Sequence, residues 1–276
     1  MPSVPRLASV VSAGSSNNGL QEVELLRVDA SRRSAMLDHV VEECAIALVY
    51  NGFSYAVMMA TPTDLEDFAI GFSLSEGLVD RADELSVLSI RTHDHAVIVE
   101  MAVAESRFHS IQARARRWLG SSACGLCGSE SLQAALPIVP HVAPGNRVRL
   151  GHITQALDHL AEQQVMNRAS GGVHAAAWVH ASTLCVREDV GRHNALDKLI
   201  GARARLRLPA GWLLLSSRAS YELVHKAAVA NIALVVVISA PTSMAIRVAE
   251  LAGITLIGFA RGERLNVYSH AHRLID

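Results

Sequence analysis

The segment 231–260, NIALVVVISAPTSMAIRVAELAGITLIGFA, decides the fold class of this 276-residue chain. Its two apolar runs, 233–240 and 254–260, are continuous, which is typical of strands that are buried on both faces of a sheet. Between them, residues 243–253 carry apolar side chains at helical spacing. Strands that are joined by a helix in this way predict an α/β domain with a parallel sheet.

The same alternation extends back to residue 151. Helices are expected at 152–164, 192–205 and 221–232, and strands at 174–180, 182–188 and 211–217. This order predicts a three-layer domain, in which helices cover both faces of a largely parallel sheet. Such sheets bind ligands at the carboxyl ends of their strands. The loops at these ends are 187–194, 216–221, 239–243 and 259–264.

The N-terminal part of the chain has a different pattern. Two β-prone runs flank Asn51-Gly52, which is the strongest short signal for a hairpin. A helix is expected within 61–78, where Thr63 and Glu66 have the spacing of a capping box. Two further strands are expected before residue 105, so this part predicts a small α+β domain.

We therefore expect four parts along the chain. Residues 1–19 form a disordered tail, residues 20–120 the α+β domain, residues 121–148 a mobile cysteine loop and linker, and residues 149–276 the α/β domain. The boundary near residue 120 follows from a change in composition, because a basic helical segment gives way to a Gly- and Ser-rich one.

Composition excludes several classes of partner. A hydrophobic content of 50% is ample for a large core, and a formal net charge of -1 gives no global attraction to nucleic acid or to an anionic membrane. The apolar runs are too short to span a bilayer. Four cysteines at irregular positions do not form a secreted disulfide framework, so we expect a cytoplasmic protein.

Two of these cysteines, Cys124 and Cys127, stand in a C-x-x-C motif within SSACGLCGSE. This spacing lets two sulfurs approach one metal ion or each other. A structural zinc ion would need further ligands, but Cys44 and Cys185 lie in apolar strand patterns and are expected to be buried. The histidines show no paired ligand spacing, so no metal of the protein's own is expected.

Two other uses of a C-x-x-C motif fit the sequence poorly. A zinc deaminase needs H-x-E followed downstream by P-C-x-x-C, whereas His174 is followed by two alanines and the motif lies upstream. A thioredoxin-like motif opens a helix behind an early strand. Here the Gly and Ser neighbours favour a loop that reaches two places, which suits a thiolate that carries sulfur as a persulfide.

Two polar segments lie at predicted strand ends. In the segment 187–199, REDVGRHNALDKL, Asp189, Arg192 and His193 stand near a helix start, and such ends attract phosphate. A solvated loop with capping ion pairs is the simpler interpretation of this segment. If it lines a nucleotide pocket, substitutions of Asp189 or Arg192 are expected to weaken guanine-nucleotide binding.

The second segment follows the last apolar strand. It consists of Phe259, Ala260, Arg261, Gly262, Glu263 and Arg264. Arginine recognises phosphate through two parallel hydrogen bonds, an aromatic ring stacks on a base, and glycine permits close backbone approach. A β-turn with exposed arginines is the alternative, and the place at a strand's carboxyl end favours a ligand site.

Four blocks of the sequence together resemble the FdhD family. They are TPTDLEDFAIGFSLSEGL, CGLCG, EDVGRHNALDK and ISAPTSMAIRVAELAGITLIGFARGERLNVYSH. The resemblance extends over about residues 20–272. It implies a sulfurtransferase that formate dehydrogenase requires for activity, with a C-terminal domain that resembles the cytidine-deaminase fold without its zinc.

The resemblance also implies partners and site residues. The family takes sulfur from a cysteine desulfurase as a persulfide, matched here by Cys124 with Cys127 as the second thiol. It passes the sulfur to the molybdenum of a bis-molybdopterin guanine dinucleotide cofactor, which is then inserted into formate dehydrogenase. Its cofactor-contacting segment matches residues 259–264, and its members are cytoplasmic homodimers.

Three hypotheses follow, from different functional classes. The first is the sulfur-carrying transferase. The second is a non-enzymatic chaperone that holds the molybdenum cofactor for formate dehydrogenase. The third is a module that is structured by zinc, which elemental analysis would test.

Overall fold

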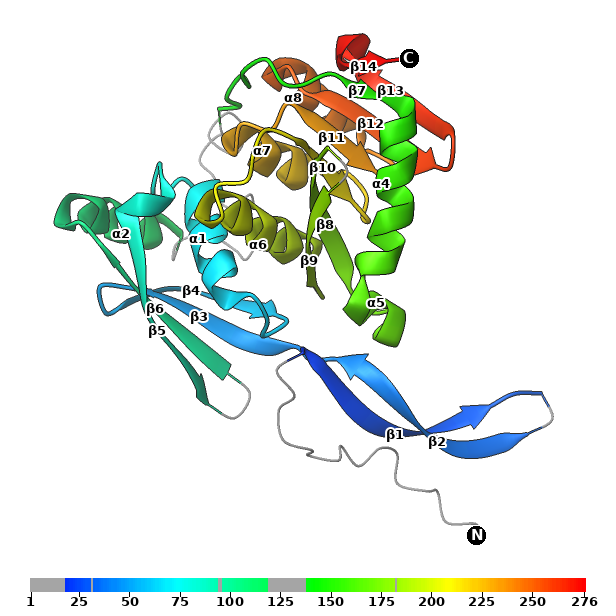
Figure 1. Cartoon of the computed structure of the whole chain (residues 1–276). Coiled ribbons are helices and arrows are strands. Elements are labelled where there is room, and N and C mark those ends of the chain that lie inside the picture. Colours follow the sequence, from blue (N-terminus) through cyan, green and yellow to red (C-terminus); the bar gives the residue numbers. More distant parts are fainter. Residues whose placement is uncertain (1–17, 31, 94–95, 119–137, 182) are drawn as a thin grey trace.

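A computed structural model describes residues 18–30, 32–93, 96–118, 138–181 and 183–276 of the chain (Figure 1). The N-terminal part contains a four-stranded sheet in the order β4-β3-β6-β5. Its strands are β3 (Cys44–Tyr50), β4 (Phe53–Ala60), β5 (Leu85–His93) and β6 (Ala96–Val103). Asn51 and Gly52 join β3 to β4 with positive φ values of 46° and 79°, which confirms the predicted hairpin.

Helix α1 (Leu65–Ser75) covers one face of this sheet, and Phe68 and Phe72 enter the core there. The short helix η1 (Ala82–Glu84) precedes β5, and α2 (Glu105–Trp118) follows β6. The capping-box prediction is wrong, because Asp64 is the N-cap residue and its side chain makes no capping hydrogen bond. The Thr63 hydroxyl instead accepts a hydrogen bond from Lys198 of the other domain.

A two-stranded ribbon precedes the α+β domain and projects away from the body of the molecule (Figure 1). It consists of β1 (Leu20–Val28) and β2 (Arg33–Val41), paired antiparallel along their whole length. Its base contacts α5 (Val165–Ser170). The ribbon is not part of the N-terminal sheet. The range 20–120 therefore contains two separate elements, the ribbon and an α+β unit that begins at β3.

The C-terminal part contains a six-stranded sheet in the order β13-β12-β11-β10-β8-β9. Its strands are β8 (His174–His180), β9 (Thr183–Asp189), β10 (Trp212–Leu215), β11 (Leu234–Val237), β12 (Thr255–Arg261) and β13 (Arg264–Ser269). The expectation of a largely parallel sheet needs correction, because only β10, β11 and β12 run parallel. The outer strands β9 and β13 follow tight turns, and a tight turn reverses the chain direction.

Helices cover both faces of this sheet, which confirms the three-layer α/β prediction. Helices α6 (Arg192–Arg205), α7 (Tyr221–Val229) and α8 (Ser243–Ala252) lie on one face and α4 (Leu150–Gln163) on the other (Figure 1). The short pair β7 (Val148–Arg149) and β14 (Leu274–Ile275) and the helix η2 (Ala271–Arg273) complete the fold. Within the described part of the chain, no helix is long and apolar enough to cross a membrane.

The two domains meet where α1 packs against α6. The helices approach through glycines, and a Cβ atom at Gly71 would lie 1.7 Å from the carbonyl oxygen of Asp197. A Cβ atom at Gly201 would lie 1.8 Å from the carbonyl oxygen of Asp67. Contact this close requires residues without a Cβ atom at both positions. Helix α6, whose start lies beside a predicted ligand loop, is therefore tied to the N-terminal domain.

Candidate functional site

The predicted sulfur-carrying residues, Cys124 and Cys127, lie outside the described residues. The two described cysteines are Cys44, which is buried, and Cys185, which is half-buried against the core. Burial raises the pKa of both thiols, so little of either is present as the reactive thiolate at neutral pH. Cys44 confirms the expectation of a small buried hydrophobic residue.

The predicted ligand loops lie together on one side of the C-terminal sheet, at the carboxyl ends of its parallel strands. Strands β10, β11 and β12 end there, and because β8 and β9 run antiparallel to their neighbours, His174 begins β8 and Asp189 ends β9 at the same edge. Neighbouring loops are also bonded to each other, since the Phe259 amide donates to the Ser239 carbonyl oxygen at 3.0 Å. The topology thus brings together segments that lie far apart in the sequence.

The segment 259–264 forms the turn between β12 and β13 at this edge. Phe259 has a φ of 51°, which is uncommon for a bulky side chain, and the residue is 40% exposed. Gly262 adopts a φ of 53° in the turn. Arg261 and Arg264 stand opposite each other across the hairpin, both are exposed, and neither has an ion pair among the described residues. These side chains are free to contact a ligand.

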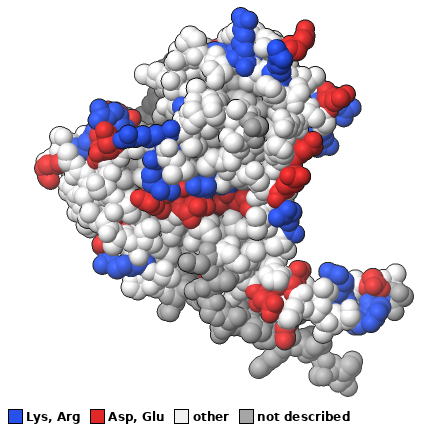
Figure 2. Space-filling view, viewed as in Figure 1, with Lys and Arg blue, Asp and Glu red and all other residues white. Residues whose placement is uncertain are grey.

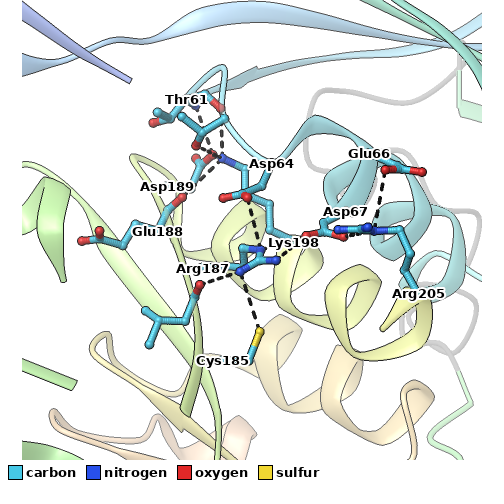
Figure 3. Close-up of polar contacts among 12 residues, drawn as sticks. Thr61, Asp64, Glu66, Asp67, Cys185, Arg187, Glu188, Asp189, Lys198 and Arg205 are labelled. Carbon is cyan, nitrogen blue, oxygen red and sulfur yellow. Dashed lines mark hydrogen bonds and ion pairs between the residues drawn. The ribbon is translucent and has the colours of Figure 1, made fainter. Parts of the chain in front are cut away.

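Asp189 lies in the protein interior, although its polar sequence context suggested a solvated loop or a ligand pocket. Its side chain is fully buried, and its Oδ2 atom lies 2.7 Å from the Nζ atom of Lys198 (Figure 3). The same oxygen accepts from the Thr61 amide at 3.1 Å, and Oδ1 accepts from the amide of Gly191 at 2.8 Å. Asn194 Nδ2 donates to Oδ1 at 3.1 Å. Asp189 therefore positions the turn that leads into α6 and does not face a ligand.

Lys198 completes this buried network. Its ammonium group donates to the carbonyl oxygens of Thr61 at 3.0 Å and Glu188 at 3.3 Å, and to the Thr63 hydroxyl at 3.2 Å. The sequence contains one other lysine, Lys226, which is also buried. Both lysines of the chain therefore serve the contact between domains, a role that their sequence positions did not indicate.

Lys226 lies in a second buried cluster. Its Nζ atom is 2.9 Å from the Asp197 carboxylate and 3.1 Å from Glu76 of the N-terminal domain. Burial opposes the charge on Lys226, but the two carboxylates outweigh it and raise the pKa of this lysine. Burial raises the pKa of Asp197, and the positive charge of Lys226 opposes that rise.

A third cluster joins α1 to β9 and α6. The buried Asp67 of α1 accepts from Arg187 at 2.7 Å and from Arg205 at 2.7 Å (Figure 3). Arg187 also lies 3.7 Å from the Cys185 sulfur. Figure 2 shows acidic and basic side chains meeting along the seam between the two domains. Around the predicted ligand loops, Asp67 and Asp189 are therefore held in ion pairs, whereas Arg261 and Arg264 have no ion-pair partner among the described residues.

Metal ligation finds no support in the described part of the chain. No group of three or more His, Cys, Asp and Glu side chains is placed there to hold a metal ion. His174, which the zinc-deaminase comparison brought forward, lies at the start of β8. Burial lowers its pKa, and the nearby charge of Arg192 adds to this effect.

Stability is expected to fall as the pH decreases below neutrality. Burial lowers the pKa of His174, His193 and His225 from the usual 6.5. As the pH falls through the unfolded-state value, the unfolded chain takes up protons that the folded protein resists, so the free energy of unfolding decreases. Urea unfolding between pH 7 and about pH 5 measures this slope.

The matched variants are His225→Gln and His152→Gln, which replace a half-buried and an exposed imidazole respectively. We expect the free energy of unfolding to fall less steeply with decreasing pH in His225→Gln than in His152→Gln. Equal slopes in the two variants would contradict the assignment of this effect to burial.

The chain is similar to known proteins over most of its length. The sequence pattern of the FdhD/NarQ family matches residues 41–275. The "Sulfur carrier protein FdhD" of Xanthomonas euvesicatoria pv. vesicatoria is 48% identical over 247 residues, 88% of each chain. The protein of the same name from Cupriavidus necator is 46% identical over 241 residues, 86% of this chain and 84% of its own.

A solved structure supports the fold. It is a protein of Desulfotalea psychrophila, described provisionally as a formate dehydrogenase accessory protein. It superposes with a TM-score of 0.73 at 22% identity and covers 93% of this chain and 99% of its own.

Proposed function

Because this chain belongs to the FdhD/NarQ family, we propose that it is a sulfurtransferase that carries sulfur for formate dehydrogenase. The observation that supports this most is the 48% identity over 247 residues to a protein named as a sulfur carrier. The likeness covers 88% of both chains, so it extends to both domains and to the C-x-x-C segment between them.

In the proposed reaction, the Cys124 thiolate attacks the outer sulfur of a persulfide on a cysteine desulfurase. The sulfur–sulfur bond of that persulfide breaks, the desulfurase cysteine leaves as a thiolate, and Cys124 becomes the persulfide. Cys127 then attacks the inner sulfur of this persulfide, which forms a Cys124–Cys127 disulfide and releases the outer sulfur as hydrosulfide for the acceptor. The raised pKa values of Cys44 and Cys185 support Cys124 and Cys127 as the reactive pair.

The proposed acceptor is the molybdenum of a bis-molybdopterin guanine dinucleotide, bound as substrate. Its phosphates need cationic donors on a protein whose formal net charge is only -1. Arg261 and Arg264 supply such donors at the ligand-binding edge of the sheet, and the ring of the exposed Phe259 is placed to stack on a base. Ala260 is buried, so it supports the turn rather than the ligand.

Sulfur loading tests the proposal directly. Incubation with a desulfurase and cysteine is expected to add the mass of one sulfur atom to the intact protein. Cys124→Ala is expected to abolish this addition, whereas Cys185→Ala, which removes a half-buried thiol, retains it. An unchanged sulfur adduct in Cys124→Ala would contradict the assignment.

The alternative function is a non-enzymatic chaperone that holds the molybdenum cofactor for the catalytic subunit of formate dehydrogenase. It is favoured by the exposed arginines of the segment 259–264, which suit a bound dinucleotide regardless of sulfur transfer. Under this alternative, Cys124→Ala supports full formate dehydrogenase activity, whereas Arg261→Gln and Arg264→Gln do not. The sulfur-carrier proposal requires that Cys124→Ala lose this support.

We further propose that the protein acts in the cytoplasm as a homodimer, as the family resemblance implies. Light scattering of the purified chain measures the mass in solution. A monomer at micromolar concentration would contradict the dimer.

A further inference from the structure

The β1–β2 ribbon exposes one of its two faces to solvent over most of its length. Residues directly opposite each other in an antiparallel pair point to the same face, and so do alternate residues along a strand. The continuous register of the ribbon therefore assigns eight exposed residues to one face, which we call the exposed ribbon face. They are Glu22, Glu24, Leu26, Val28, Arg33, Ala35, Leu37 and His39.

The centre of the exposed ribbon face is apolar. Leu26, Leu37 and Val28 are 45%, 52% and 59% exposed, and Ala35 lies directly opposite Leu26. The four residues occupy three successive cross-strand rows of this face, so they form a continuous patch. Single apolar side chains are normal at a protein surface, whereas a continuous patch indicates a contact with another molecule.

The ribbon receives little support from the rest of the described chain. It projects away from the body of the molecule, and its base contacts α5 (Figure 1). Among the described residues, β1 and β2 pair only with each other. An isolated two-stranded hairpin is at best marginally stable in water, and packing on its apolar face stabilises it. A molecule that covers the apolar patch would therefore stabilise the ribbon.

The charge on the exposed ribbon face changes sign between its base and its tip. Glu22 and Glu24 lie toward the base and Arg33 lies near the tip, and none of them has an ion pair among the described residues. Figure 2 shows acidic side chains near the base and mainly basic ones toward the tip. A surface that is negative at one end, apolar in the middle and positive at the other end complements a copy of itself that runs in the opposite direction.

We propose that the exposed ribbon face binds the same face of a second copy of this chain, with the two ribbons antiparallel about a two-fold axis at the row Leu26–Ala35. The row Glu24–Leu37 of one copy then lies against the row Val28–Arg33 of the other. Each Glu24 is thus within reach of Arg33 of the other copy, and the apolar side chains fill the centre. The inference rests on the homodimer proposed above and names its contact surface.

Leu26→Glu tests the apolar centre of the contact. Because Leu26 of each copy lies at the axis, the change brings two carboxylates together in an apolar contact, and we expect dimerisation to weaken at least about 100-fold. Sedimentation equilibrium of the full chain measures the dimer dissociation constant. Leu251→Glu is the matched control, because Leu251 is a leucine of α8 that is 68% exposed, and it is expected to leave this constant unchanged.

Charge reversal tests the antiparallel arrangement. Glu24→Arg places two arginines together across the contact, Arg33→Glu places two glutamates together, and each is expected to weaken dimerisation at least about ten-fold. An equimolar mixture of the two variants is expected to recover the wild-type constant, because the mixed dimer has an opposite charge at both places. Within one chain the two positions are separated by about 13 Å along the ribbon, so an effect inside the chain does not explain recovery on mixing.

Three results would each overturn the proposal: a monomeric wild type, equal dissociation constants in wild type and Leu26→Glu, or no recovery in the mixture. Sulfur loading is measured on the same samples. A chain that dimerises as expected but takes up no sulfur contradicts the sulfur carrier alone. Sulfur uptake by a monomeric wild type contradicts the dimer and its ribbon contact alone.

Discussion

Lys198→Met is expected to lower the free energy of unfolding by about 3 to 5 kcal/mol, because it leaves the Asp189 carboxylate buried without its cation. The wild-type ion pair spans 2.7 Å between two side chains that are both fully buried. The ammonium group also serves two carbonyl oxygens and the Thr63 hydroxyl, and methionine can donate to none of them. Urea unfolding at pH 7 measures the change.

An exposed ion pair provides the matched control. Arg91 lies 2.5 Å from Glu100, and its side chain is 54% exposed, so Arg91→Met is expected to cost at most about 1 kcal/mol. Adding Asp189→Asn to Lys198→Met removes the uncompensated charge and is expected to restore part of the lost stability. Equal effects of Lys198→Met and Arg91→Met would contradict this account.

The consequence for function follows from the position of the pair. Asp189 binds the Gly191 amide and the Asn194 side chain, and Arg192 and His193 lie between these two residues. Movement of Asp189 therefore displaces the start of α6. We therefore expect Lys198→Met to disturb the position of the segment 190–194 as well as to lower the stability.

Gly201→Ala is expected to lower the free energy of unfolding by more than about 3 kcal/mol, which is beyond the usual cost of an added methyl group. The new Cβ atom would lie 1.8 Å from the Asp67 carbonyl oxygen and 2.8 Å from the Gly71 amide nitrogen. Both are backbone atoms of α1, so no side chain can rotate away and the two helices must separate.

Separation of α1 from α6 also stretches the contacts of Asp67 with Arg187 and Arg205, which are both 2.7 Å long. Gly151→Ala is the control, since Gly151 lies in α4 with nothing within 4 Å of the added atom. Alanine has the higher helix propensity, so this control is expected to be neutral or stabilising by up to about 1 kcal/mol. A similar small change in Gly201→Ala would show that the helices do not pack as closely as described.

The sequence by itself determined those elements whose cause is local. The Asn51-Gly52 turn needs positive φ values that these residues adopt readily, and the structure places a hairpin there. Helix α6 spans the predicted range of 192–205. The three-layer arrangement and the meeting of the ligand loops at one sheet edge also follow from the order of elements.

Only the tertiary structure decided which polar residues are available to a ligand. Asp189, Arg192 and His193 share one charged segment, and nothing in their spacing separates a buried structural carboxylate from a free arginine. The separation comes from Thr61, which is 128 positions from Asp189 and reaches it only because α1 docks on α6. The predicted capping box failed for the same reason, since the Thr63 hydroxyl serves Lys198 from the other domain. Hydrogen-bond partners this distant in sequence leave no periodic pattern, so folding alone assigns them.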